Sequence, residues 1–90
     1  MPAFLVSCAP TVRINERLKT GTYIEARSGL WIVCDTGNAA DLAARLAAVD
    51  RSDGLVVVRI VNNEDWYSAS KIEPDVMNQI KTLLNGCLEN

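Results

Sequence analysis

Hydrophobic residues along this chain fall into short runs separated by polar turns. Four of these runs are rich in β-branched or aromatic residues, the pattern of strands in a partly buried sheet. They cover residues 3–8, 23–26, 30–34 and 55–61. The cluster Arg27-Ser28-Gly29 between the second and third runs is typical of a turn, so these two strands are predicted to form a hairpin.

Two further segments have apolar residues at helical spacing near the ends of the chain. Thr11 can cap a short helix in which Ile14 and Leu18 lie four residues apart, and Gly21 would end it. A C-terminal helix is predicted from Pro74, which suits a first helical turn, to Gly86. Its apolar residues share one side: Val76, Ile80, Leu83, Leu84 and Cys87.

The helix that begins after Asn38 has the strongest pattern. Asn38 is an N-cap residue with Asp41 at the third helical position, a capping-box arrangement. Apolar residues then follow at intervals of four and three among alanines: Leu42, Leu46 and Val49. We therefore expect Leu46→Ala to be strongly destabilising and Arg45→Ala to cost far less.

The order of these elements is β-α-β-β-α-β-α, which predicts an α+β fold. A right-handed crossover leaves room for the third strand between the first two, so the sheet order becomes 4-1-3-2. This is the split βαβ, or ferredoxin-like, arrangement with an additional C-terminal helix. No linker or repeat divides the chain, and residues 1–90 are expected to form one domain.

Composition excludes several classes of function. The chain has no histidine, which removes Ser-His and Cys-His dyads and imidazole-based zinc sites, and no cofactor is expected. The three cysteines, Cys8, Cys34 and Cys87, form no C-x-x-C pair and are odd in number, a pattern that favours reduced thiols in a cytoplasmic protein. No apolar stretch approaches the length of a membrane span or a signal peptide, so no membrane association is expected.

One short motif suggests a catalytic function. Asp35-Thr36-Gly37 follows the apolar residues 31–34, and aspartic proteases present their catalytic carboxylate in this way, paired across a two-fold axis. The competing interpretation is a strand-to-helix turn, because a helix begins immediately afterwards and no second hydrophobic-hydrophobic-Gly element supports an active-site loop. We favour the turn and keep the protease as a remote alternative.

Two other residue groups are candidates for binding. Trp66 and Tyr67, with Asp65 beside them and Arg59 on the fourth strand, are the candidate partner-binding residues, although the two aromatic residues would equally suit the end of a core. A modest basic face is the candidate nucleic-acid site, and a solvated helix face accounts for it equally: Arg13, Arg17, Lys19 and Arg27. The net charge of −2 gives nucleic-acid binding no further support.

The strand sequences resemble those of small Cas2-like proteins of the SinR family. The resemblance lies in residues 4–7 (FLVS), 28–33 (SGLWIV) and 53–60 (DGLVVVRI). It implies a ferredoxin-like homodimer, with a link to CRISPR adaptation or nuclease activity as a distant possibility. In the Cas2-type nucleases an aspartate directly after the first strand is the metal-binding residue, whereas Cys8 and Ala9 occupy the matching positions here. Neither residue binds magnesium, so the family's nuclease chemistry is not expected, and Cys8 is interpreted as a buried, unreactive thiol.

The sequence thus predicts a non-enzymatic, cytoplasmic protein-interaction module that forms a homodimer. Strands two and four are the expected sheet edges. Strand four is β-branched over residues 55–61 and interrupted by one charge, Arg59, so it is poorly protected against pairing with another chain.

Overall fold

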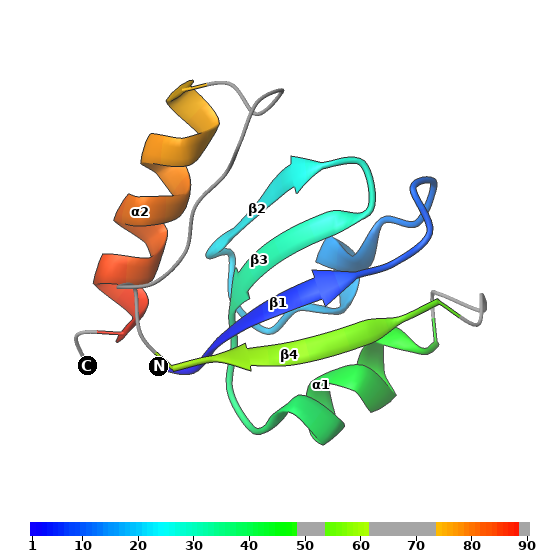
Figure 1. Cartoon of the computed structure of the whole chain (residues 1–90). Coiled ribbons are helices and arrows are strands. Elements are labelled where there is room, and N and C mark those ends of the chain that lie inside the picture. The colour runs from blue at the N-terminus through cyan, green and yellow to red at the C-terminus, as the bar shows by residue number, and fades with distance from the viewer. Residues whose placement is uncertain (49–53, 62–73, 89–90) are drawn as a thin grey trace.

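The computed structural model describes residues 1–48, 54–61 and 74–88. Four strands, a short 3₁₀ helix and two α-helices make up this part of the chain (Figure 1). In chain order they are β1 (Ala3–Ser7), η1 (Ile14–Arg17), β2 (Tyr23–Arg27), β3 (Leu30–Cys34), α1 (Ala39–Leu46), β4 (Val56–Ile60) and α2 (Pro74–Leu88).

The four strands form one antiparallel sheet in the order β2-β3-β1-β4, which confirms the predicted order 4-1-3-2. Ala3 at the start of β1 lies opposite Cys34 on one side and Ile60 on the other. Because β1 and β3 are antiparallel, Cys8 and Cys34 stand at opposite ends of the sheet.

One face of the sheet packs against η1 and α1. Successive side chains of a strand point to opposite faces, so alternate residues of β1 and β3 meet the buried face of α1. The core on this side contains Phe4, Val6, Cys8, Ile14, Trp31, Val33, Leu42 and Leu46. α1 begins with the predicted capping box, in which Asn38 accepts from the backbone N–H of Asp41 and Asp41 accepts from that of Asn38.

The opposite face of the sheet packs against α2. The buried residues here come from β1, β3 and the apolar side of α2: Ala3, Ile32, Cys34, Ile80, Leu84 and Cys87. The predicted apolar side of the C-terminal helix is therefore confirmed. The helix continues through Gly86 to Leu88 instead of ending at the glycine.

The prediction of a helix after Thr11 is wrong. Only four residues, Ile14–Arg17, are helical, and they form a 3₁₀ turn. Arg13 before this turn is not in helical geometry and gives no side-chain cap, and Leu18 after it is already extended. Ile14 is the one buried residue of the turn, and a single buried side chain cannot offset the cost of nucleating a longer helix.

Several predictions fall on residues outside the described ranges. Asp65, Trp66, Tyr67 and Val49 are among them. Within the ranges that are described, no helix has the length and apolar character needed to cross a membrane.

Candidate functional site

The most exposed apolar residues of the sheet gather on β4 and directly after it. Among the described residues β4 pairs with β1 and with no other strand, so it is an edge of the sheet. Val56, Val58 and Val61 are 54%, 50% and 77% exposed, and we call these three residues the valine edge. An apolar edge strand is a template for strand addition by another chain.

The position of α2 explains why Val56 and Val58 are exposed. Val57 packs into the core beneath α1, so by strand alternation Val56, Val58 and Ile60 all belong to the α2 face. Ile60 packs against the core formed with α2, whereas Val58 and Val56 lie progressively farther along β4 from it (Figure 1). Among the described residues, α2 thus covers one end of this face and does not reach the other.

The other sheet edge, β2, has different protection. Its pairing with β3 shifts between Glu25 and Arg27, and such an irregularity disrupts a regular edge. The Glu25 carboxylate also forms an ion pair with the Arg13 guanidinium, at an N–O distance of 3.0 Å. Bulges and charges are the features by which natural sheets discourage pairing at an edge, so the two edges of this sheet are not equivalent.

The predicted partner-binding and basic residues are only partly brought together. Arg59 is exposed on β4, and strand alternation places it on the face opposite to Val56 and Val58. Arg13 is engaged with Glu25 and lies over the Trp31 ring at 5.4 Å, which reduces its availability to a phosphate. The other three residues of the basic group are exposed on η1, after it and at the end of β2: Arg17, Lys19 and Arg27. This arrangement adds no support to a nucleic-acid interface.

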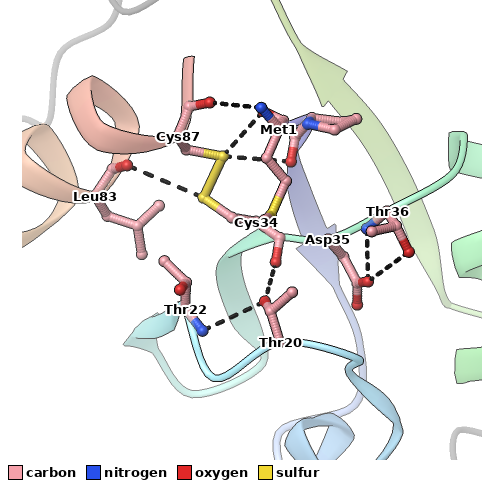
Figure 2. The surroundings of a disulfide bond; sticks show 9 residues. Met1, Thr20, Thr22, Cys34, Asp35, Thr36, Leu83 and Cys87 are labelled. Atoms are coloured by element: carbon pink, nitrogen blue, oxygen red, sulfur yellow. Dashed lines mark hydrogen bonds between the residues drawn. A yellow bond between two sulfur atoms is a disulfide. The ribbon is translucent and has the colours of Figure 1, made fainter. Parts of the chain in front are cut away.

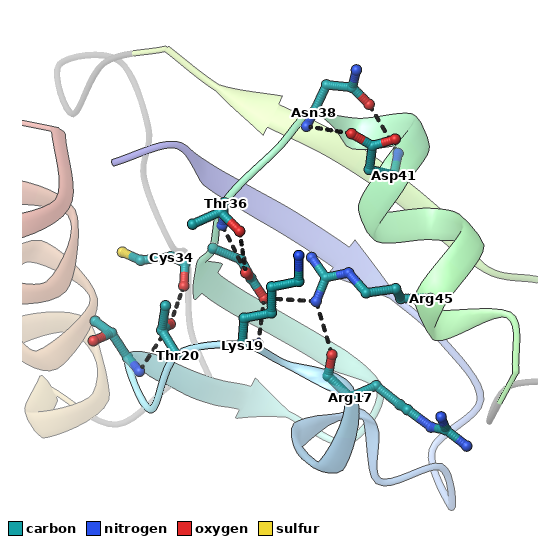
Figure 3. A network of polar contacts seen from close by, with 10 residues as sticks. Arg17, Lys19, Thr20, Cys34, Thr36, Asn38, Asp41 and Arg45 are labelled. Carbon is teal, nitrogen blue, oxygen red and sulfur yellow. Dashed lines mark hydrogen bonds and ion pairs between the residues drawn. The ribbon is translucent and has the colours of Figure 1, made fainter.

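Figure 3 shows a polar network at the end of β3 that includes Lys19, Thr36 and Arg45. All three residues donate hydrogen bonds to the carboxylate of Asp35. The Asp35 side chain is 0% exposed. Oδ2 accepts from the backbone N–H of Lys19 at 3.0 Å and from the Arg45 guanidinium at 3.3 Å, while Oδ1 accepts from the backbone N–H of Thr36 at 2.7 Å. Arg45 also donates to the carbonyl of Arg17 at 2.9 Å. The carboxylate therefore joins the segment before β2 to α1.

These contacts determine the ionisation of Asp35. Burial alone would raise its pKa, because a low-dielectric surrounding disfavours the charged form. The hydrogen bonds from Lys19, Arg45 and Thr36, together with the charge of Arg45, outweigh burial and hold the pKa of Asp35 below its ordinary value. Asp35 is accordingly a buried carboxylate in an ion pair.

Asp35-Thr36-Gly37 has the geometry of a structural turn. Both oxygen atoms of Asp35 are occupied by donors from its own chain, and none of the side chain reaches solvent. Gly37 has a φ of 89°, in the left-handed region that favours glycine, and the α1 cap follows at once. This geometry does not present a carboxylate to a peptide, and it gives the protease alternative no support.

The prediction of three reduced thiols is wrong. Cys34 and Cys87 form a disulfide that connects the end of β3 to the last turn of α2, with their Cα atoms 6.1 Å apart (Figure 2). The backbone nitrogen of Met1 donates to the carbonyl of Cys87 at 3.0 Å, which brings the first residues to the same place. The thiol-based reason for a cytoplasmic location is therefore lost, because disulfides persist mainly in oxidising compartments.

Sequence reasoning missed two features of this site: the disulfide and the contact of Arg45 with Asp35. A signal existed for each, since Cys87 shares the apolar side of α2 with Ile80 and Leu84, and Arg45 lies next to the buried Leu46. Neither signal identifies the partner residue. Cys8 is buried, and no group of three or more metal-binding side chains occurs in the described part of the chain.

A comparison with protein-family models finds no family that matches this chain, and comparisons with curated proteins and with solved structures find no match either. Function is therefore inferred from the geometry of the chain itself.

Proposed function

We propose that this chain is a non-enzymatic protein-interaction module that acts as a homodimer, in which the β4 strands of two copies pair to form one continuous sheet. The observation that carries the proposal is the valine edge: two exposed valines on an edge strand, and a third directly after it, where the strand pairs only with β1 among the described residues. Strand addition at such an edge gains main-chain hydrogen bonds and buries the exposed side chains together.

A second copy suits this edge because the edge is complementary to itself. A two-fold axis perpendicular to the sheet pairs β4 with its copy in antiparallel orientation, so paired residues must lie on the same face. With Val58 on the axis, Val56 of each copy faces Ile60 of the other, and Arg59 faces Val57. Centring the pair on Arg59 would place two like charges directly opposite each other, which is unfavourable. We therefore assign the register centred on Val58.

The non-enzymatic part of the proposal draws on the state of the candidate catalytic groups. Asp35 is enclosed and ion-paired, and the chain contains no histidine to act as a general base. The fold we propose is the ferredoxin-like split βαβ, with its first crossover helix reduced to η1. The same fold and the same dimeric state are what the Cas2-like resemblance implies. Cytoplasmic location stays a prediction.

Light scattering coupled to size exclusion tests the dimer directly. At micromolar concentration we expect a mass twice the 9.8 kDa of one chain. Val58→Lys should convert the protein to monomers, because it places two positive charges opposite each other at the axis of the paired strands. Val58 is half exposed, so its substitution should leave the monomer folded, which circular dichroism can verify.

The matched control is Tyr23→Lys on the other sheet edge. Tyr23 is 37% exposed and begins β2, so this substitution adds the same charge to an edge that should not pair. We expect the Tyr23→Lys variant to remain a dimer. A wild-type mass near that of one chain at every concentration would overturn the dimer, and dissociation by Tyr23→Lys alone would overturn its assignment to β4.

A further inference from the structure

We infer that the Cys34–Cys87 disulfide is a redox-controlled latch: a dithiol reductant releases α2 from the sheet and uncovers the rest of the apolar face beside the valine edge. The disulfide lies between the end of β3 and the last turn of α2 (Figure 2), and it is the covalent link between that turn and the sheet. The effect on self-association described below rests on the proposed function. The release of α2 does not.

Apart from this link, apolar packing and one hydrogen bond from Met1 to the carbonyl of Cys87 hold α2 to the rest of the chain. Ile80, Leu84 and Cys87 are buried against the sheet, and one of these is the bonded cysteine itself. Three more apolar residues of the helix are partly buried beside them: Val76, Leu83 and Leu88. An isolated helix of 15 residues is marginal in water, and its stability in a protein comes mostly from the packing of its apolar side.

The composition of α2 lowers its own helical stability further. Gly86 stands inside the last turn, where glycine has low helix propensity. That turn has no basic residue of its own to interact with the helix dipole, and the Met1 ammonium that donates to the carbonyl of Cys87 at 3.0 Å takes this place. The disulfide lies in the same turn and adds a covalent link there.

Release of α2 would extend the surface already exposed on β4. The sheet residues beneath the helix are Ala3, Ile32, Cys34 and Ile60. Ile60 shares its face with Val58 and Val56, and Leu5 of β1 lies opposite both Val58 and Ile32. The newly exposed apolar area is therefore continuous with the valine edge, and it would strengthen the pairing of two copies.

The chemistry of the latch is an ordinary thiol-disulfide exchange. A thiolate of the reductant attacks one sulfur of the Cys34–Cys87 bond, giving a mixed disulfide and one free cysteine thiolate, and the second thiol of the reductant then displaces the other cysteine. Two electrons and two protons pass from the dithiol to the protein, so the protein ends with two thiols and the reductant with a disulfide. Both cysteines are buried, so attack follows opening of the last turn of α2.

Hydrogen exchange followed by mass spectrometry, with and without dithiothreitol, tests the latch. Without reductant, the intact mass should be lower than that of the fully reduced chain by two hydrogens. On reduction, backbone amides in the α2 segment 76–88 should exchange about tenfold faster or more, while those of β1 and β3 keep their protection. Cys87→Ser should show the fast exchange without reductant. Cys8→Ser, which leaves the disulfide intact, should behave like the wild type.

Three results would overturn the latch: thiols that are already reduced in the purified protein, an α2 that stays equally protected after reduction, or a sheet that loses protection together with α2. Light scattering on the same samples separates the two proposals. Faster exchange of α2 in a protein that stays monomeric supports the latch and refutes the homodimer, whereas a dimer whose α2 never opens supports the homodimer and refutes the latch.

Discussion

Arg45→Ala should destabilise this protein about as much as the loss of a core leucine. Arg45 is exposed over 24% of its side chain, yet its guanidinium donates to the fully buried carboxylate of Asp35 at 3.3 Å and to the carbonyl of Arg17 at 2.9 Å. The sequence alone suggested that Arg45→Ala would cost far less than Leu46→Ala. That expectation treated Arg45 as a solvated position, and the structure contradicts this premise.

The magnitude follows from what remains around Asp35. Removing one partner of a buried ion pair costs about 3–5 kcal/mol, because the other charge is left uncompensated. Asp35 would keep the backbone N–H donors of Lys19 and Thr36, so we expect the low end of this range, about 3 kcal/mol. Small domains unfold with roughly 5–15 kcal/mol in total, so the loss is readily measured by urea denaturation.

The pH dependence of stability distinguishes the ion pair from a mere packing effect. The pKa of Asp35 in the folded protein is below its ordinary value, so its contribution to stability is fully present above the unfolded pKa of about 3.9. That contribution is lost as the pH falls through the lower folded pKa. In the Arg45→Ala variant the guanidinium no longer lowers the pKa of Asp35, so burial, which raises that pKa, has a larger share in the balance. Acidification through this range should therefore destabilise the variant less than the wild type, or should stabilise it.

The assay is the free energy of unfolding in urea at several pH values between about 7 and 3, measured for the wild type, Arg45→Ala and Asp35→Asn. Asp35→Asn removes the titrating group and serves as the reference for its share of the pH dependence. The ion pair would be refuted as a source of stability if Arg45→Ala lowered the free energy of unfolding by less than about 0.5 kcal/mol and if this variant lost stability at low pH in the same way as the wild type.

Two other substitutions test the packing of the sheet. Leu46→Ala should cost about 2–5 kcal/mol, since Leu46 is fully buried in the core beneath α1, and an unchanged urea midpoint would contradict that placement. Gly29→Ala should cost more than about 1 kcal/mol, because Gly29 has a φ of 83° and a Cβ there would overlap the carbonyl oxygen of Cys8. Gly21→Ala, where a Cβ meets no atom within 4 Å, is the control and should be close to neutral. Equal effects of the two glycine substitutions would show that the β2–β3 turn is misplaced.

The strands and the sheet order were predictable because the signals for them are local or topological. The run Leu30–Cys34 is continuous in apolar residues and becomes a central strand, buried on both sides. Asn38 and Asp41 define the start of α1 through a capping box that needs no other part of the chain. Given the element order, the handedness of crossovers leaves few arrangements of the sheet.

The features that sequence analysis missed depend on pairs of residues distant in the chain. Cys34 and Cys87 are separated by 53 positions, and their spacing carries no information about whether their side chains meet. The failure at residues 14–18 has the opposite cause. The spacing of Ile14 and Leu18 fits a helix, but too little of that segment is buried to stabilise one, and burial is a tertiary property.

Two contacts at the end of β3 connect the sheet to helices on opposite faces: the Cys34–Cys87 disulfide and the Asp35–Arg45 ion pair. Each can therefore be removed separately. Neighbouring residues of a strand point to opposite faces, so Cys34 reaches α2 while Asp35, directly after it, reaches Arg45 on α1 (Figures 2 and 3). The side-chain contacts of Asp35 involve neither cysteine, so we expect them to survive reduction of the disulfide, and we expect the disulfide to survive loss of Arg45. The sheet can therefore keep α1 and its core when α2 is released. Val57 packs β4 on the α1 side, and among the described residues no strand pairs with the outer side of β4. If α1 and its core stay in place, β4 therefore stays ordered as a pairing edge in both redox states.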